Sequence, residues 1–136
     1  MTDAKRSCVS GQENFTTLTT LADLQAANGK AEDARKTMDR AISHPTAGPI
    51  DIHQYGRQLQ ARGKNEEAMR IFEMNAKKHP NVWPVHVGLA RGHAALGRTK
   101  EALAEARLAL AQAPDDGNRQ GIETLIKQIE EAGGSR

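Results

Sequence analysis

The chain has almost none of the residues from which disulfide networks and metal centres are built. Among its 136 residues there is a single cysteine, Cys8, so no internal disulfide can form. No Cys/His pair has the spacing of zinc ligands. Cys8 also has no base held beside it by helical spacing, and we interpret it as incidental rather than as a nucleophile. We therefore expect no metal, no cofactor and no catalysis.

Aromatic residues are few, and neither sign of charge is in large excess. Only 3% of the residues are aromatic, and 19 basic and 17 acidic residues leave a formal net charge of +2. Such a balance gives little electrostatic support for a nucleic-acid or membrane-surface partner, and we expect neither. The chain start has no apolar run typical of a secretory signal, and no transmembrane segment follows. These features predict a cytoplasmic protein, or a periplasmic or exported one if the chain is a fragment.

The sequence does contain glycines at a regular spacing. Three glycines lie 34 residues apart, and an alanine follows each of them five residues later. These pairs are Gly29 and Ala34, Gly63 and Ala68, and Gly97 and Ala102. A fixed period of this length is typical of stacked repeats, each of which is one supersecondary unit. The period predicts helix pairs at about 15–48, 49–82 and 83–116 within a single domain at 14–132.

The segments outside these pairs complete the predicted organisation. Residues 1–13 are polar and are interpreted as a flexible leader, with Asn14 as the cap of the first helix. A last helix over about 118–132 carries Ile122, Leu125, Ile126 and Ile129 on one face and polar residues on the other. Such a helix is typical of the end of a stack, beyond which nothing packs. Residues 133–136 are predicted to form a flexible tail.

The apolar spacing also predicts which residues face the core. The expected inward positions are Leu18, Leu21, Ala22 and Gln25; Ala34, Met38, Ala41 and Ile42; Ile52, Tyr55, Gly56 and Leu59; Ala68, Ile71, Phe72 and Ala76; His86, Leu89, Ala90 and His93; and Ala102, Leu103, Ala106, Ala109 and Leu110.

These residues resemble the tetratricopeptide repeat family over about residues 15–115. The resemblance is carried by Leu21-Ala22, Gly29, Ala34 and Ala41, by Tyr55-Gly56, Leu59, Gly63, Ala68, Phe72 and Pro80, and by Leu89-Ala90, Gly97, Ala102, Ala109 and Pro114. It implies an all-α, right-handed superhelical solenoid of three helix-turn-helix units plus a C-terminal capping helix. A second resemblance, over 53–59, 75–92 and 110–118, is to the C-terminal repeat segment of bacterial exported proteins of unknown function.

The family resemblance implies a binding function. In this family the first helices of successive repeats line a concave groove that receives a peptide or protein segment, which makes the protein an interaction scaffold. The groove positions that this implies for partner binding are Thr19, Asp23, His53, Arg57, Gln60, Val87 and Arg91. The identity of the protein partner stays open. A self-assembling or dimerising module, and an accessory segment of a larger exported bacterial protein, are the alternatives.

Equivalent positions in the three repeats hold Asp23, Arg57 and Arg91, and two interpretations of them are open. The arginines could fork a carboxylate or phosphate of a ligand, or Asp23 could pair with Arg57 and leave Arg91 solvated. The chaperone-tail receptors of the family clamp a C-terminal carboxylate with cationic residues. None of these occurs at the corresponding positions Thr19, Asp23, Gln54, Pro84 and Gly88, and we do not expect that function.

The single tryptophan and the histidines also allow two interpretations. Trp83 could plug the junction between repeats, which we favour, or anchor a partner at the surface. His44 and His79 precede prolines at the ends of equivalent helices, where an imidazole interacts favourably with the helix carbonyls. His86 and His93 are expected to be packed and hydrogen-bonded rather than to bind a metal.

Overall fold

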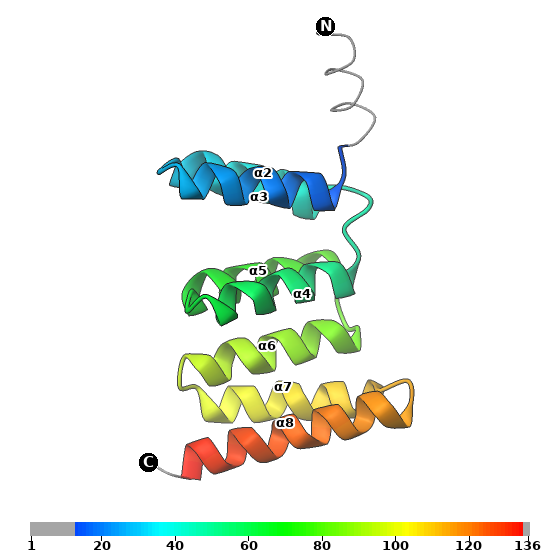
Figure 1. The fold of residues 1–136 in the computed structure, drawn as a ribbon. Coiled ribbons are helices and arrows are strands. Elements are labelled where there is room, and N and C mark those ends of the chain that lie inside the picture. The colour runs from blue at the N-terminus through cyan, green and yellow to red at the C-terminus, as the bar shows by residue number, and fades with distance from the viewer. Residues whose placement is uncertain (1–12, 135–136) are drawn as a thin grey trace, which may run out of the picture. The chain divides into compact units, whose positions relative to one another are not determined.

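The computed structural model describes residues 13–134, and all of the regular secondary structure in that range is α-helical. The helices are α2 (Phe15–Ala27), α3 (Ala31–Ser43), α4 (Pro49–Ala61), α5 (Asn65–Lys78), α6 (Trp83–Ala95), α7 (Thr99–Gln112) and α8 (Asp116–Gly134) (Figure 1). The predicted all-α repeat class is confirmed. The chain divides into two compact units at the Gly48–Pro49 boundary. Cys8 and all but the last residue of the predicted leader lie outside the described residues.

The first unit is the α2–α3 helical hairpin. Asn14 caps α2 as predicted, because its side-chain oxygen accepts a hydrogen bond from the Thr17 amide at 2.9 Å. Leu18 and Ala22 are buried along α2. Leu21, predicted to face the core, is instead 41% exposed. In this unit the inward stripe of α2 is therefore narrower than the apolar spacing suggests.

The three periodic glycines end the first helix of each pair. Gly29, Gly63 and Gly97 have φ angles of 79°, 79° and 80°, a left-handed conformation that favours glycine. The amide of the following residue reaches back to a carbonyl near the helix end in every case, for example from Lys64 to Leu59 at 2.9 Å. This is the pattern of a Schellman C-cap. The 34-residue period is thus explained by the geometry of one recurring turn.

Phe72 holds α4, α5 and α6 together at the centre of the second unit. It is fully buried, and glycines of the two neighbouring helices face its ring. A Cβ atom added to Gly56 would lie 2.3 Å from Phe72 Cε1, and one added to Gly88 would lie 2.7 Å from Phe72 Cδ1. These glycines are required because α4 and α6 approach the ring more closely than any side chain allows. The contact places α4 and α6 side by side (Figure 1).

The C-terminal part of the second unit packs α6, α7 and α8 around one apolar core. Its buried members are Val87 and Ala90 from α6, Ala102, Ala106 and Ala109 from α7, and Ile122, Leu125 and Ile129 from α8. Of the other predicted inward residues in this unit, Ala76, Leu89 and His93 are only partly buried. The inward alanines Ala68, Ala90, Ala102, Ala106 and Ala109 are fully buried as predicted, and Ala76 is the exception among residues 49–134.

Helix α8 is longer than the predicted 118–132 segment. It begins at Asp116 because the Asp115 carboxylate accepts a hydrogen bond from the Asn118 amide at 2.8 Å. At the other end, Gly133 lies so close to the start of α7 that an added Cβ would be 2.6 Å from Thr99 Cγ2. The prediction of a flexible tail from residue 133 is wrong for 133 and 134, which are helical. Residues 135–136 lie outside the described range.

Candidate functional site

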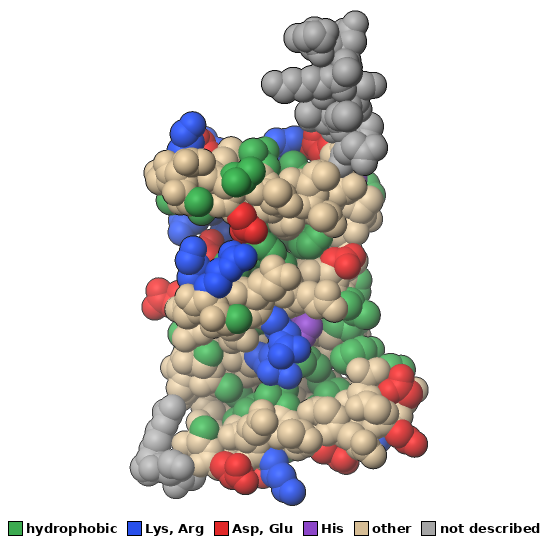
Figure 2. All heavy atoms as spheres, viewed as in Figure 1, with side chains coloured by type: hydrophobic (Ala, Val, Ile, Leu, Met, Phe, Trp, Pro, Cys, Tyr) green, Lys and Arg blue, Asp and Glu red, His purple; other side chains and the backbone are tan. Residues whose placement is uncertain are grey.

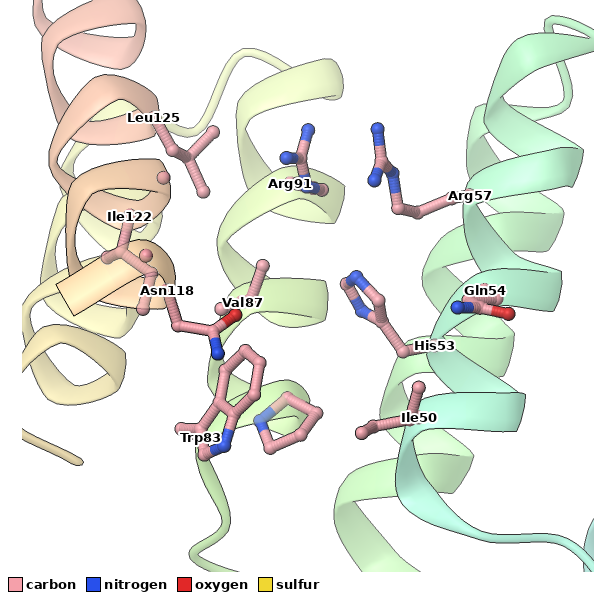
Figure 3. Close-up of a pocket in the computed structure, with 13 residues that line it drawn as sticks. Ile50, His53, Gln54, Arg57, Trp83, Val87, Arg91, Asn118, Ile122 and Leu125 are labelled. Atoms are coloured by element: carbon pink, nitrogen blue, oxygen red, sulfur yellow. The ribbon is translucent and has the colours of Figure 1, made fainter. Parts of the chain in front are cut away.

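The second unit contains a cavity of about 410 Å³ between its first helices and α8. We call it the α4–α6–α8 groove (Figure 3). It is lined by Ile50, His53, Gln54 and Arg57 of α4, by Trp83, Pro84, Val87 and Arg91 of α6, and by Gly117, Asn118, Gly121, Ile122 and Leu125 of α8.

Residues at equivalent positions of the repeat line the three walls of the groove. Arg57, Arg91 and Leu125 are separated by 34 residues each, as are Ile50, Pro84 and Asn118. Helix α8 therefore occupies the place of a first helix, and it contributes to the groove rather than only closing the stack. The 34-residue spacing continued past Pro114 indicates this position for α8, although Glu131 stands where the next glycine would fall.

One end of the groove is cationic. Arg57 from α4 and Arg91 from α6 direct their guanidinium groups toward the same space (Figure 3). Over the described residues 49–134 no ion pair or hydrogen bond joins either guanidinium to an acidic side chain. The Nε atom of Arg91 is buried without a hydrogen-bond partner. Burial, with the neighbouring charge of Arg57, lowers the pKa of Arg91 from its ordinary value.

His53 lies beside the two arginines and rests on the central phenylalanine. Its ring centroid is 5.7 Å from that of Phe72, with the ring planes tilted by 36°. Burial first, and then the charges of Arg91 and Arg57, lower the pKa of His53 to about 4. The imidazole is therefore neutral near pH 7, and its Nδ1 atom is buried without a hydrogen-bond partner. In Figure 2, Lys and Arg side chains gather beside a histidine over α6, with hydrophobic side chains around them.

The other end of the groove is apolar. Trp83 packs partly against the α6–α7–α8 core and also lines the groove; its role as an anchor for a partner stays a prediction. Ile50 is 50% exposed on the facing wall, and Asn118 points in from α8 (Figure 3). Val87 on the α6 wall is buried. The groove thus offers apolar surface at one end and positive charge at the other.

The structure brings together some of the predicted groove residues and separates others. His53, Arg57, Val87 and Arg91 line the cavity, whereas Gln60 lies just beside it and donates a hydrogen bond to the Arg91 carbonyl at 3.1 Å. Val87 was expected to be an open groove position but is only 6% exposed, because α8 packs against it.

Two predicted groove residues belong to the first unit. Thr19 was expected to face the groove, but it is buried, and its hydroxyl donates a hydrogen bond to the Thr16 carbonyl at 2.9 Å. Asp23 is partly buried on α2. Its pairing with Arg57 would join the two units and stays a prediction.

Three of the histidines outside the groove have partners or caps, whereas His93, which was expected to be hydrogen-bonded, has its Nδ1 atom buried without a hydrogen-bond partner. His86 is buried, and its Nδ1 atom lies 2.7 Å from Glu105 Oε1 on α7. His44 and His79 occupy the C-caps of α3 and α5. Residues 13–134 contain no cluster of three or more His, Cys, Asp or Glu residues able to hold a metal ion.

Within the described part of the chain, no helix is both long enough and apolar enough to cross a bilayer.

Comparison with known families supports the repeat architecture. A family model described as tetratricopeptide repeat matches residues 59–126, which is half of the chain. The match runs from the last part of α4 into α8, and it includes both the α6 and the α8 walls of the groove. A comparison with curated proteins finds no similar sequence. The periodic glycine turns, the helix pairs and this match agree, and the chain belongs to the tetratricopeptide repeat family.

Proposed function

We propose that the protein is an interaction module whose α4–α6–α8 groove receives a polypeptide segment of a partner protein. Repeats of this family are generally protein–protein interaction modules and are typically non-catalytic. The observation that carries the proposal is a preformed groove built from equivalent helix positions, with an apolar end and an unpaired cationic end. Its volume lies in the range of pockets that bind compact ligands, which corresponds to a few side chains of a peptide.

The walls of the groove favour recognition through side chains. All three walls are helical, so most of their backbone N–H and C=O groups already bond within the helices. A partner strand therefore cannot add to the groove as it would to the edge of a β-sheet. Specificity then comes from the arginines, Trp83 and the aliphatic residues, which are side-chain types that contribute strongly to interfaces.

The chemistry of the lining residues supports binding rather than catalysis. The side chains that line the groove include no hydroxyl, thiol or carboxylate group. His53 would be the only candidate base among them, and its pKa of about 4 makes it a weak one. A covalent mechanism at this groove would lack a nucleophile from the lining itself.

A steric block tests the proposal without assuming anything about ligand charge. Gly121 lines the groove, and an added Cβ there would meet no neighbouring atom within 4 Å, so Gly121→Phe should fill the groove while the unit stays folded. Lys127→Phe, at an exposed position of the same helix outside the groove lining, is the matched control. We expect proteins captured from host lysate by the wild type and by Lys127→Phe to be lost with Gly121→Phe.

The outcome also separates the main alternative. Equal capture by the two phenylalanine variants would show that the groove is not the binding site. If the chain captures only further copies of itself, and its mass in light scattering rises with concentration, the self-assembly interpretation replaces the groove proposal.

A further inference from the structure

We propose that the segment received by the α4–α6–α8 groove is acidic, with a side-chain carboxylate held between Arg57 and Arg91 and a nearby apolar side chain packed against Trp83 and Ile50. This inference rests on the proposed function and specifies the chemistry of the partner. It requires an aspartate or glutamate within the bound segment and does not require a free chain terminus.

The charge distribution of the groove is the first argument. Two guanidinium groups from different helices face one space, and the residues lining that space include no acidic side chain. Like charges held close together in a partly buried site disfavour each other. The buried, unpartnered Nε atom of Arg91 shows a hydrogen-bond donor left unused there. A ligand anion would supply the missing charge and would accept hydrogen bonds from the terminal nitrogen atoms of the two guanidinium groups.

The donor set can hold a carboxylate without help from the protein backbone. A carboxylate has two oxygens, and each can accept from one edge of a guanidinium group. A phosphoryl group brings three strong acceptor oxygens and a charge of about −1.5 to −2, and arginines bind it as well, so a phosphorylated segment is the direct competitor in the test below. The lining of this groove has no hydroxyl. Its amide side chains Gln54 and Asn118 lie away from the guanidinium groups (Figure 3).

The geometry of α4 sets the spacing of the motif. Arg57 and Ile50 are seven residues apart on one helix, which corresponds to roughly 10 Å along its axis. An extended peptide covers that length in about three residues. The acidic residue and the apolar residue should therefore be about three positions apart in an extended segment. Gly117 and Gly121 on the α8 wall leave room for the peptide backbone to approach.

Selection from a random peptide library displayed on phage tests the inference with the full chain as bait. We expect the selected peptides to be enriched in an Asp or Glu about three positions from a large apolar residue, and to be displaced when the bait carries Gly121→Phe. Peptides that depend on an open groove but show no acidic enrichment would overturn the inference and leave the proposed function standing. No selected peptides, or peptides indifferent to Gly121→Phe, would overturn both.

Synthetic versions of a selected peptide then measure the contribution of the carboxylate by calorimetry. Replacing its Glu by Gln, or replacing Arg57 or Arg91 by Ala, should weaken binding by about 10- to 100-fold. Arg119→Ala removes an exposed arginine of α8 outside the groove lining and should leave the affinity unchanged. A phosphoserine peptide that binds more tightly than the Glu peptide, or a Gln peptide that binds equally well, would overturn the carboxylate assignment.

The pKa of His53 offers an independent test, because it should change on ligand binding only if the bound carboxylate lies beside the two arginines. The charged groups that face it are Arg57 on its own helix and Arg91 on α6, while α5 presents the uncharged ring of Phe72. A bound carboxylate would offset these positive charges, so the NMR titration midpoint of His53 should rise from its free value near 4. An unchanged midpoint with the peptide bound would place the acidic group elsewhere.

Discussion

Substituting Gly56 by alanine should disrupt the packing that positions the two arginine-bearing helices. The new Cβ would lie 2.3 Å from Phe72 Cε1 and 2.8 Å from two further ring atoms, whereas carbon atoms in contact are normally about 3.5–4.0 Å apart. Phe72 is fully buried, so the ring cannot move aside without displacing other core residues. Overpacking of this kind costs about 1–3 kcal/mol.

The same substitution also brings a gain, which a second glycine can measure. Replacing glycine by alanine inside a helix stabilises it by roughly 0.5–1 kcal/mol. Gly121 lies inside α8, and a Cβ added there would meet no neighbouring atom within 4 Å, so Gly121→Ala should show this gain alone. We expect Gly56→Ala to lower the free energy of unfolding by about 1–2 kcal/mol net, and Gly121→Ala to raise it.

Urea unfolding followed by tryptophan fluorescence is the suitable assay, because the single tryptophan, Trp83, lies in the second unit with both glycines. A double-mutant cycle with Phe72→Leu identifies the cause, since a smaller side chain at 72 should recover part of the loss caused by Gly56→Ala. If Gly56→Ala is as stable as Gly121→Ala, or if its cost is unchanged beside Phe72→Leu, then Phe72 does not set the approach of α4 and α6.

Three further predictions concern buried polar groups of the second unit. The pKa of His53 in the folded protein is about 4, below its ordinary value of 6.5, so the unfolded chain binds more protons between these two pH values. The free energy of unfolding should therefore fall as the pH drops from 6.5 to 4. In urea unfolding, His53→Gln should lack this part of the pH dependence. The Asn75 side-chain amide donates to the Pro49 carbonyl at 3.0 Å, so Asn75→Ala should cost about 1–3 kcal/mol in thermal or urea unfolding; a neutral effect would show that the bond contributes nothing. Arg91→Met should raise the free energy of unfolding by about 1 kcal/mol, because it removes an unpaired, partly buried charge, and it should weaken binding of acidic peptides in calorimetry by about 10- to 100-fold. A less stable variant would show that the charge is compensated in the folded protein.

The features that the sequence predicts best are those fixed by local backbone geometry and by size. Gly63 ends a helix in a left-handed conformation that side chains rarely adopt, so its period is visible without any knowledge of packing. Ala68 and Ala102 are fully buried where helices approach closely. Positions of this kind tolerate few residue types, and their pattern therefore predicts the fold.

One repeat has a polar residue at a position where the other two have alanine, and its reason is visible only in the structure. Where two repeats have the buried alanines Ala41 and Ala109, the second has Asn75. Its amide holds the first residue of α4 through the Pro49 carbonyl, a partner 26 residues away that no local pattern indicates. Such polar contacts depend on which segments meet in space, and a period in sequence does not contain that information.

The groove was predicted only in part, and the missing wall has a physical reason. Hydrophobic periodicity detects side chains, whereas Gly117 and Gly121 contribute to the groove by having none. The apolar and polar faces of α8 predict a capping helix and give no sign that it lines a groove. Val87 was consequently assigned to an open surface, although α8 buries it.

The arginines of the groove are better explained by binding than by stability. The second unit is held together by Phe72 among its glycines and by the apolar core of α6, α7 and α8, and neither set of contacts involves a guanidinium group. Two facing arginines with no acidic partner in the groove lining add only mutual repulsion and desolvation to the folded state. Their placement is therefore accounted for by the ligand proposed above rather than by folding. An acidic ligand would supply the opposite charge and the missing acceptors, and the groove at that point is open to receive it.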